Sequence, residues 1–427
     1  MKILIYGLNY APELTGIGKY TAEMAEALAL LGHEVRVVCA PPYYPEWRVA
    51  PGHSAARYCT EVRRGVRIWR APLWVPAQPS GATRMVHLAS FALSSLPLLL
   101  RQALWRPEVV MTIAPALMCA PAAAALARVT GAKSWLHVQD FEVDAAFNLG
   151  LLRSERAARI AHAVERALMR RFDVVSSISA RMVERAQRLG VETGRLFSLP
   201  NWVDTNVIYP LHGANGYRRE LEIPDGNRVV LYSGNMGSKQ GLELLAAAAA
   251  RLVERTDLSF VFCGNGATKA ELMRRCEGLP NCRFLPVQPA ERLNELLNLA
   301  DIHVLPQRGD AADLVMPSKL TGMLASGGAI IAMARPGTEL HAAVEGRGVV
   351  VEPENVEALA AAIAALAGDP LRRATLGAAA RRYAEETLAP AAVFSRLDAR
   401  LAELGRGDGG APRHARPVST TENRSPR

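Results

Sequence analysis

Cysteine is scarce in this sequence, and the six cysteines that it contains are scattered. No two of them form a C-x-x-C pair, and none stands near a histidine cluster. Neither a disulfide framework nor a zinc site is therefore indicated, and a reducing cytoplasm is the compartment that fits best.

Long uncharged apolar runs are also missing. The leucine-rich run between Arg84 and Arg101 is too short and too rich in serine for a spanning helix of about 20 residues. Residues 1–6 lead straight into a turn and lack the apolar core and cleavage site of a secretory signal. We therefore expect neither a signal peptide nor a transmembrane segment.

Acidic residues are absent between positions 63 and 106, in a chain whose formal charge is +9. The arginines of this stretch are Arg63, Arg64, Arg67, Arg70, Arg84, Arg101 and Arg106. Trp69, Trp74, Phe91 and a leucine-rich run are interleaved with them. Such a surface suits anionic lipid or a lipid-linked pyrophosphate. The alternative is a buried helix with solvated flanking arginines. No recognised nucleic-acid module accompanies the charge, so nucleic acid is not an expected partner.

The 427 residues, half of them apolar, are enough for two packed cores. In the first half, apolar runs with strand character alternate with helical periodicity. The predicted strands are 2–6, 35–39, 109–113, 133–138 and 174–178. This alternation is typical of a parallel sheet flanked by helices, and we assign residues 1–205 to an N-terminal Rossmann-like domain.

A break rich in Pro, Asn and Gly follows position 200, and a second alternation then begins. Its predicted strands are 229–233, 258–263, 283–285, 302–305, 329–333 and 348–351. Residues 206–385 are thus predicted to form a second doubly wound domain. A helix over about 386–404 is expected beyond it, and residues 405–427 have the composition of a disordered tail.

In open parallel sheets, ligands bind at the carboxyl ends of strands, and three glycine turns follow predicted strands. Gly16 and Gly18 form a plausible anion or acceptor cradle, with a purely structural turn as the alternative. In the second domain, a phosphate site is predicted after the first strand. It consists of Gly234, Asn235 and Lys239, and Gly264 and Gly266 occupy the turn after the next strand.

Ser318 and Lys319 begin another predicted helix, directly after Pro317. Proline suits a first helical turn, so both side chains would project from the positive end of the helix, where a diphosphate is stabilised. In the first domain, one strand ends in His137, Asp140 and Glu142. A catalytic histidine and an orienting carboxylate belong at such a position, although a buried core histidine is the alternative.

With these residues in place, the chain resembles the family 4 glycosyltransferases of the GT-B architecture over nearly all of residues 1–404. The turn at Gly16–Gly18, His137, the Pro200-Asn201-x-Val203-Asp204 motif and the segment 317–327 carry the resemblance. Within that family, the chain is most similar to colanic-acid-type exopolysaccharide enzymes described as fucosyltransferases. The closest matches are residues 9–18, 137–140 and 317–321.

The resemblance implies a retaining hexosyltransferase that needs no metal or other cofactor. Its donor would be a GDP- or UDP-sugar, with fucose as one candidate, and its acceptor a lipid-linked oligosaccharide at the inner face of the cytoplasmic membrane. The enzyme would be cytoplasmic and peripheral to that membrane. His137 would contact the donor sugar, and Lys239 and Lys319 the diphosphate. The base would be read by backbone around Val287.

Some positions depart from the family pattern. Many members carry two glutamates in the segment that corresponds to residues 314–322, and the second of them binds the donor ribose. Leu314 and Gly322 occupy those two positions here, and Asp313 is the nearest carboxylate. Two alternatives therefore stay open: a sugar-nucleotide epimerase of the same architecture, and a non-catalytic sugar-nucleotide-binding scaffold. The sequence leaves the base, the sugar, the linkage and the oligomeric state undetermined.

Overall fold

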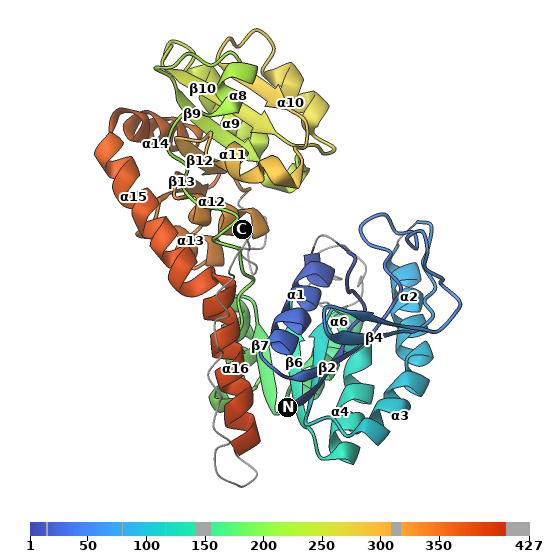
Figure 1. The fold of residues 1–427 in the computed structure, drawn as a ribbon. Helices are drawn as coiled ribbons and strands as arrows, with labels where there is room; N and C mark the ends of the chain where they lie inside the picture. The colour runs from blue at the N-terminus through green and yellow to red at the C-terminus, as the bar shows by residue number, and fades with distance from the viewer. Residues whose placement is uncertain (14–15, 79, 116, 142–154, 309–316, 407–427) are drawn as a thin grey trace, which may run out of the picture.

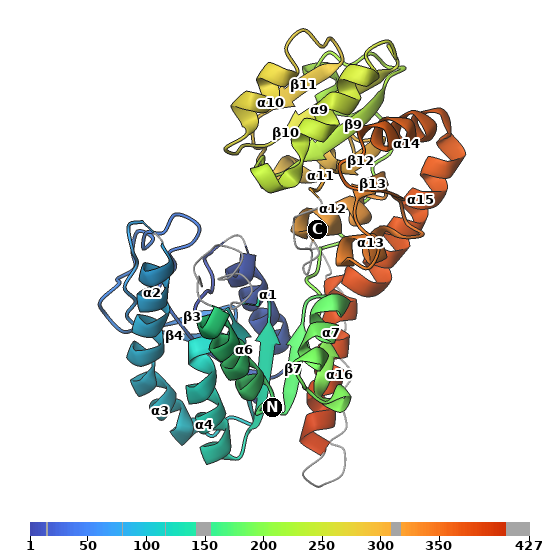
Figure 2. The ribbon, with the colours of Figure 1, turned by 180° about the vertical axis from the view of Figure 1, so that it is seen from behind.

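The computed structural model describes the whole chain except residues 14–15, 79, 116, 142–154, 309–316 and 407–427. It contains two α/β domains, which are joined by a linker and by the long C-terminal helices (Figures 1 and 2). The predicted fold class is confirmed: each domain has a largely parallel sheet with helices around it.

The N-terminal sheet has, within the described residues, eight strands in the order β3-β4-β2-β1-β5-β6-β7-β8. All neighbouring pairs are parallel except β3 and β4. The strands are β1 Lys2–Tyr6, β2 Glu34–Cys39, β3 Cys59–Arg63, β4 Val66–Arg70, β5 Val109–Ala114, β6 Lys133–Val138, β7 Val174–Ser177 and β8 Leu196–Ser198. The helices are α1 Gly16–Leu30, α2 Gly81–Ser94, α3 Leu96–Trp105, η1 Leu117–Cys119, α4 Ala120–Thr130, α6 Glu155–Met169, α7 Ala180–Arg188 and η2 Thr193–Arg195.

The C-terminal sheet has, over the same described part of the chain, six parallel strands in the order β11-β10-β9-β12-β13-β14. The strands are β9 Arg228–Ser233, β10 Leu258–Cys263, β11 Cys282–Leu285, β12 Ile302–Leu305, β13 Ala329–Met333 and β14 Val349–Val351. The helices are α8 Gly216–Glu220, η3 Ser238–Gln240, α9 Leu242–Arg251, α10 Lys269–Arg275, η4 Ala290–Arg292, α11 Leu293–Leu297, α12 Ser318–Ser326, α13 Glu339–Val344, α14 Val356–Gly368, α15 Pro370–Tyr383, the π-helical η5 Ala384–Leu388 and α16 Pro390–Arg406. The predicted domain boundary at residue 205 falls between the two sheets.

The last helix, α16, returns to the N-terminal domain (Figure 1). Val393, Leu397 and Leu401 are fully buried in the same core as β1, β2 and α1. Their spacing of four residues puts them on one helix face, and burial of each contributes about 1.5–3 kcal/mol. The two domains also touch where the Arg181 amide of α7 donates to the Glu339 carboxylate of α13, at 3.0 Å.

The hairpin of β3 and β4 was not predicted from the sequence. Its two-residue turn, Arg64-Gly65, has positive φ at both positions, which is the geometry that twisted hairpins favour. Arg63 and Arg64 both pair with the buried Glu26 of α1, and Arg70 is buried against Glu61 of β3. The basic stretch is therefore not one surface, because three of its arginines are engaged in ion pairs within the domain.

One helical stretch bears on the absence of a membrane-spanning segment, which stays a prediction. Residues 81–105, which form α2 and α3, are by length and composition long and apolar enough to cross a membrane. Such a helix is weak evidence of a span, since core helices of soluble proteins pass the same test. Here one face packs into the domain core through Phe91, Leu98 and Leu99, so α2 and α3 are part of a folded domain (Figure 2).

Candidate active site

The strand order of the C-terminal sheet places its ligand position at the end of β9. The chain leaves β9 toward β10 and β11 on one side and resumes at β12 on the other, and ligands bind where strand order reverses in this way. The glycine turn predicted as a phosphate site follows β9 directly. Residue Ser233 at the end of β9 is in register with Cys263 of β10, so the turns after the two strands lie at the same level.

Two of the glycines in these turns are needed because the turns pack on each other. A Cβ on Gly264 would stand 1.9 Å from the Gly234 carbonyl oxygen, and one on Gly266 would stand 2.3 Å from that of Met236. Both glycines also have φ near +150°, which side chains rarely adopt. We predicted that Gly264 and Gly266 leave bare backbone for a nucleotide. The structure gives them another role, because the turn after β9 occupies the space that their side chains would need.

Lys319 is held beside the first turn. Its Nζ donates to the Tyr232 hydroxyl at 2.8 Å and lies 4.3 Å from the centre of the Tyr232 ring. The Tyr232 hydroxyl in turn donates to the Asn235 carbonyl oxygen. A Cβ on Gly234 would stand 3.6 Å from Nζ, so the glycine keeps the space around the ammonium open.

Among the described residues, no carboxylate forms an ion pair with the Lys319 ammonium, whose partner is the Tyr232 side chain. Burial lowers the pKa of Lys319 to about 8, since the charged form loses hydration that Tyr232 only partly replaces. A bound anion would favour the charged form and raise the pKa again. An oriented, partly desolvated cation next to a glycine turn is suited to binding a diphosphate.

The other predicted donor residues are placed less tightly. Asn235 and Ser318 are exposed, and Ser318 is the first residue of α12. Val287 is 68% exposed, two residues beyond the end of β11. The side chain of Lys239 and the whole of Asp313 and Leu314 lie outside the described residues.

Gln240 and Gly322 both have structural roles. Next to the predicted phosphate-site residue Lys239, the side-chain oxygen of Gln240 accepts the Gly237 amide at 3.0 Å, which closes the turn. Gly322 faces α11, because a Cβ there would stand 3.2 Å from Leu297 Cδ1. Gln240 thus closes the loop after β9, and Gly322 allows α12 to pack closely against α11.

His137 lies on β6 and is 2% exposed. Its Nδ1 lies 2.9 Å from the Ser176 hydroxyl of β7, which also accepts the Trp135 indole N–H at 2.7 Å. The Ser176 hydrogen is then available to Nδ1, an arrangement that leaves the histidine proton on Nε2. Burial lowers the pKa of His137 to about 4, so the ring is neutral at pH 7 and can donate a hydrogen bond without adding charge. Asp140 is exposed just beyond this strand, and Glu142 lies outside the described residues.

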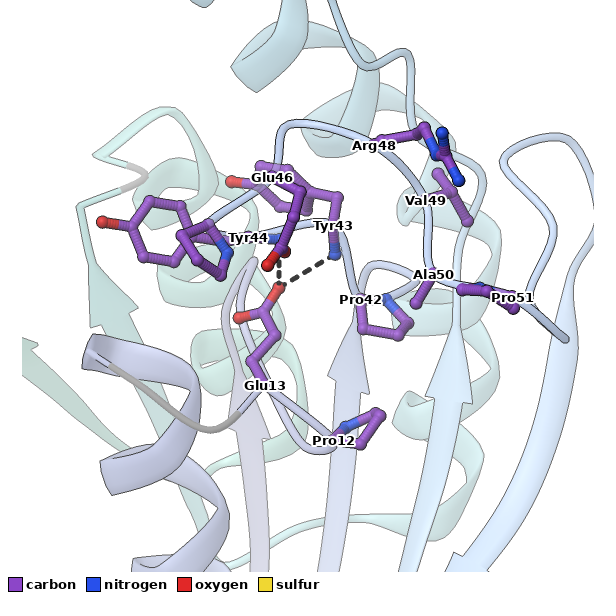
Figure 3. Close-up of a pocket in the computed structure, with 11 residues that line it drawn as sticks. Pro12, Glu13, Pro42, Tyr43, Tyr44, Glu46, Arg48, Val49, Ala50 and Pro51 are labelled. Atoms are coloured by element: carbon purple, nitrogen blue, oxygen red, sulfur yellow. Dashed lines mark hydrogen bonds between the residues drawn. The ribbon is translucent and has the colours of Figure 1, made fainter. Parts of the chain in front are cut away.

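Glu13 is a buried carboxyl that the sequence reasoning did not single out. One oxygen accepts the amides of Tyr43 and Tyr44, each at 3.1 Å (Figure 3). The other accepts the Asn9 side-chain amide at 3.0 Å. A Cβ on Gly18 would stand 2.4 Å from Glu13 Oε2, so this glycine is needed for the close approach. Burial raises the pKa of Glu13 despite these donors. The Gly16–Gly18 turn is thus built around Glu13.

Arg70 links the two loops that Glu13 joins. Its guanidinium donates to the Ala11 carbonyl oxygen at 2.6 Å and to that of Ala40 at 2.8 Å, and it pairs with Glu61. Ala11 follows β1 and Ala40 follows β2. No sequence signal distinguished this arginine from its neighbours, because its role depends on strands that meet only in the folded sheet.

Comparisons with known proteins agree with this arrangement. Residues 15–202 match the model described as "Glycosyl transferase 4-like domain", and residues 215–383 match "Glycosyl transferases group 1". The chain is 45% identical over 402 residues to the colanic acid biosynthesis glycosyl transferase WcaI of Escherichia coli K12, covering 91% of this chain and 96% of that protein. The chain belongs to the family 4 glycosyltransferases of the GT-B class.

Solved structures resemble this glycosyltransferase over almost its full length. Sucrose-phosphate synthase of Thermosynechococcus elongatus superimposes with a TM-score of 0.71 at 19% identity, over 95% of this chain and 100% of that one. Anabaena HepE, solved with UDP, superimposes with a TM-score of 0.67 at 15% identity, over 94% of this chain and 100% of its own. At these identities the likeness shows the fold alone.

Proposed function

We propose that this glycosyltransferase moves a sugar from a nucleoside diphosphate donor to a lipid-linked glycan in the assembly of an exopolysaccharide. The observation that carries the proposal is Lys319, an oriented cation beside the Gly234 turn at the point where strand order reverses. The name of WcaI supports an exopolysaccharide product, and the HepE complex supports a uridine or similar nucleotide donor. Fucose remains one candidate sugar.

The proposed reaction retains configuration at the transferred sugar and uses no metal. Lys319 and the helix amino end of α12 would stabilise the negative charge that grows on the leaving diphosphate. Neutral His137 would donate a hydrogen bond to the donor sugar, and Asp140 would orient the acceptor. Among the residues that the structure describes, no group of three His, Cys, Asp or Glu could hold a metal ion.

Membrane attachment of this cytoplasmic enzyme is proposed for one face of α2 and α3. The side chains of Leu93, Leu100 and Leu104 are 68%, 73% and 88% exposed there. Arg101 and Arg106 are exposed beside them. An apolar helix face flanked by arginines matches a bilayer surface that carries anionic lipid, whose headgroups complement the guanidinium charge.

A panel of GDP-, UDP- and ADP-sugars, incubated with the enzyme and bacterial lipid extract, tests the transfer. We expect one donor class to be consumed and one hexosyl or deoxyhexosyl mass to be added to a lipid-linked product, read by mass spectrometry. Binding of a nucleotide without any transfer would contradict the proposal and favour a scaffold. Conversion of the donor sugar to its epimer would favour an epimerase.

The membrane proposal predicts a loss of vesicle binding when Leu93, Leu100 and Leu104 are all replaced by Gln. Each exposed leucine contributes about 1 kcal/mol or more if it enters the bilayer, so binding to phosphatidylglycerol vesicles should fall by roughly a hundredfold or more. Vesicle co-sedimentation measures the change. The matched control is Leu371→Gln on α15, since that leucine is 77% exposed in the other domain. Equal binding by the triple variant and this control would refute the proposal.

A further inference from the structure

A pocket of about 670 Å³ lies in the N-terminal domain, beside the loop built around Glu13 (Figure 3). Its volume falls within the roughly 300–1,000 Å³ of small-molecule sites. Among the described residues, its lining comes from the loops after β1 and β2. It therefore belongs to neither the glycine turns nor the Lys319 site of the C-terminal domain.

The pocket is stiff and preformed. Four of its lining residues are prolines, which fix φ, and Glu13 binds the amides of Tyr43 and Tyr44 on one wall. On the outside, Tyr43, Trp47 and His87 form a cluster with ring centres 4.8–5.6 Å apart, and Arg84 stacks on Trp47. His87 and Arg84 lie on α2, so the wall of the pocket is fixed to the helix that carries Leu93, and α3 with Leu100 and Leu104 follows it directly.

Tyr44 differs from its neighbour Tyr43 because its ring is available to a ligand. Tyr44 is 42% exposed, whereas Tyr43 is 5% exposed. A Cβ on Gly16 would stand 3.8 Å from the Tyr44 ring, so the ring lies next to the amino end of α1. Glu46 and Arg48 line the same pocket and are exposed.

The charges of the pocket select the class of ligand. Two carboxyl groups, on Glu13 and Glu46, stand against one guanidinium, on Arg48. A diphosphate would be repelled by such a lining, whereas sugar hydroxyls can donate to carboxylates and accept from arginine. A tyrosine ring also provides an apolar surface for the C–H face of a sugar.

We propose that this pocket binds a neutral sugar of the acceptor glycan, with Tyr44 as the platform and Glu46 and Arg48 as partners of its hydroxyl groups. The proposal rests on the proposed function and adds the acceptor subsite to it. Because α2 anchors the pocket and carries Leu93, and α3 with Leu100 and Leu104 follows it directly, a glycan reaching the pocket would start from a lipid held close by.

Binding of neutral methyl glycosides of glucose, galactose, mannose and fucose tests the pocket by saturation-transfer NMR. We expect at least one glycoside to bind weakly, and Tyr44→Ala to weaken that binding by about tenfold. Glu46→Gln should weaken it less, since it removes one charged acceptor and keeps the shape. The matched control is Tyr209→Ala, because Tyr209 is also 42% exposed and lies in the linker region.

Two outcomes would overturn the proposal: no glycoside binds the wild-type protein, or Tyr44→Ala binds as well as the control. Donor binding separates this result from a failure of the proposed function. Thermal stabilisation by nucleoside diphosphates should be the same in Tyr44→Ala and wild type. In the lipid-extract assay, Tyr44→Ala should reduce sugar transfer well below that of the control Tyr209→Ala.

Discussion

Lys319→Ala is expected to lower kcat/KM for the donor by about 10²–10³-fold, the loss typical of removing one preorganised group that stabilises transition-state charge. The ammonium lies beside the Gly234 turn and is held there by Tyr232, so no rearrangement is needed when the diphosphate leaves. Steady-state kinetics with the donor found in the panel measures the effect. Thermal stabilisation by the matching nucleoside diphosphate should also be mostly lost.

The fold of the variant should survive, because burial disfavours the charged form of this lysine in the free protein. Arg274→Ala is the control: it removes the same single charge from an exposed position on α10. If Lys319→Ala and Arg274→Ala both retained most of the wild-type turnover, Lys319 would not contact the donor. Lys319→Arg should recover part of the activity, since it restores the charge with a different shape.

Gly264→Ala is expected to destabilise the C-terminal domain by about 3 kcal/mol or more, as judged from typical costs of steric overlap and backbone strain. The new methyl group would meet the Gly234 carbonyl oxygen, whose position is fixed by β9. Backbone cannot move aside as a flexible side chain can. Thermal or urea unfolding of the purified variant measures the loss, and nucleotide binding should fall because the two turns separate.

Gly278→Ala separates overlap from backbone strain. Gly278 also has positive φ, at 78°, but an added Cβ would meet nothing within 4 Å. This control should lose only about 1 kcal/mol, the cost of a side chain in the left-handed region. Similar stabilities for the two variants would show that the turns after β9 and β10 are not packed as described.

The sequence identified two parts of the candidate site, whose roles stay predictions, because they follow a strand or begin a helix in the chain. The glycine turn after β9 and Lys319 at the start of α12 were identified from turn residues, helix starts and spacing. Tyr232 was missed because a tyrosine near the end of an apolar strand has the same pattern as a core residue. Only its contact with Lys319 distinguishes it.

The hairpin of β3 and β4 shows a different limit. Arginine and apolar residues alternate along β4, which is typical of a strand. The density of positive charge in the sequence indicated a lipid-facing surface instead. Glu26, which pairs with Arg63 and Arg64, lies on α1, and Glu61, which pairs with Arg70, lies just before the acid-free stretch. A pattern of charge therefore could not show which side chains were already paired.

The sequence by itself determined the alternation of strands and helices, the order of the two domains, and the glycine turns and Lys319 that we propose to meet phosphate. These features are local, because periodicity, turn residues and helix starts depend on neighbours in the chain. Only the tertiary structure decided why Gly18, Gly264 and Gly266 must be glycine, and which carboxyl holds the first turn together. Those facts depend on close approach between segments far apart in the chain, and sequence spacing does not contain that distance.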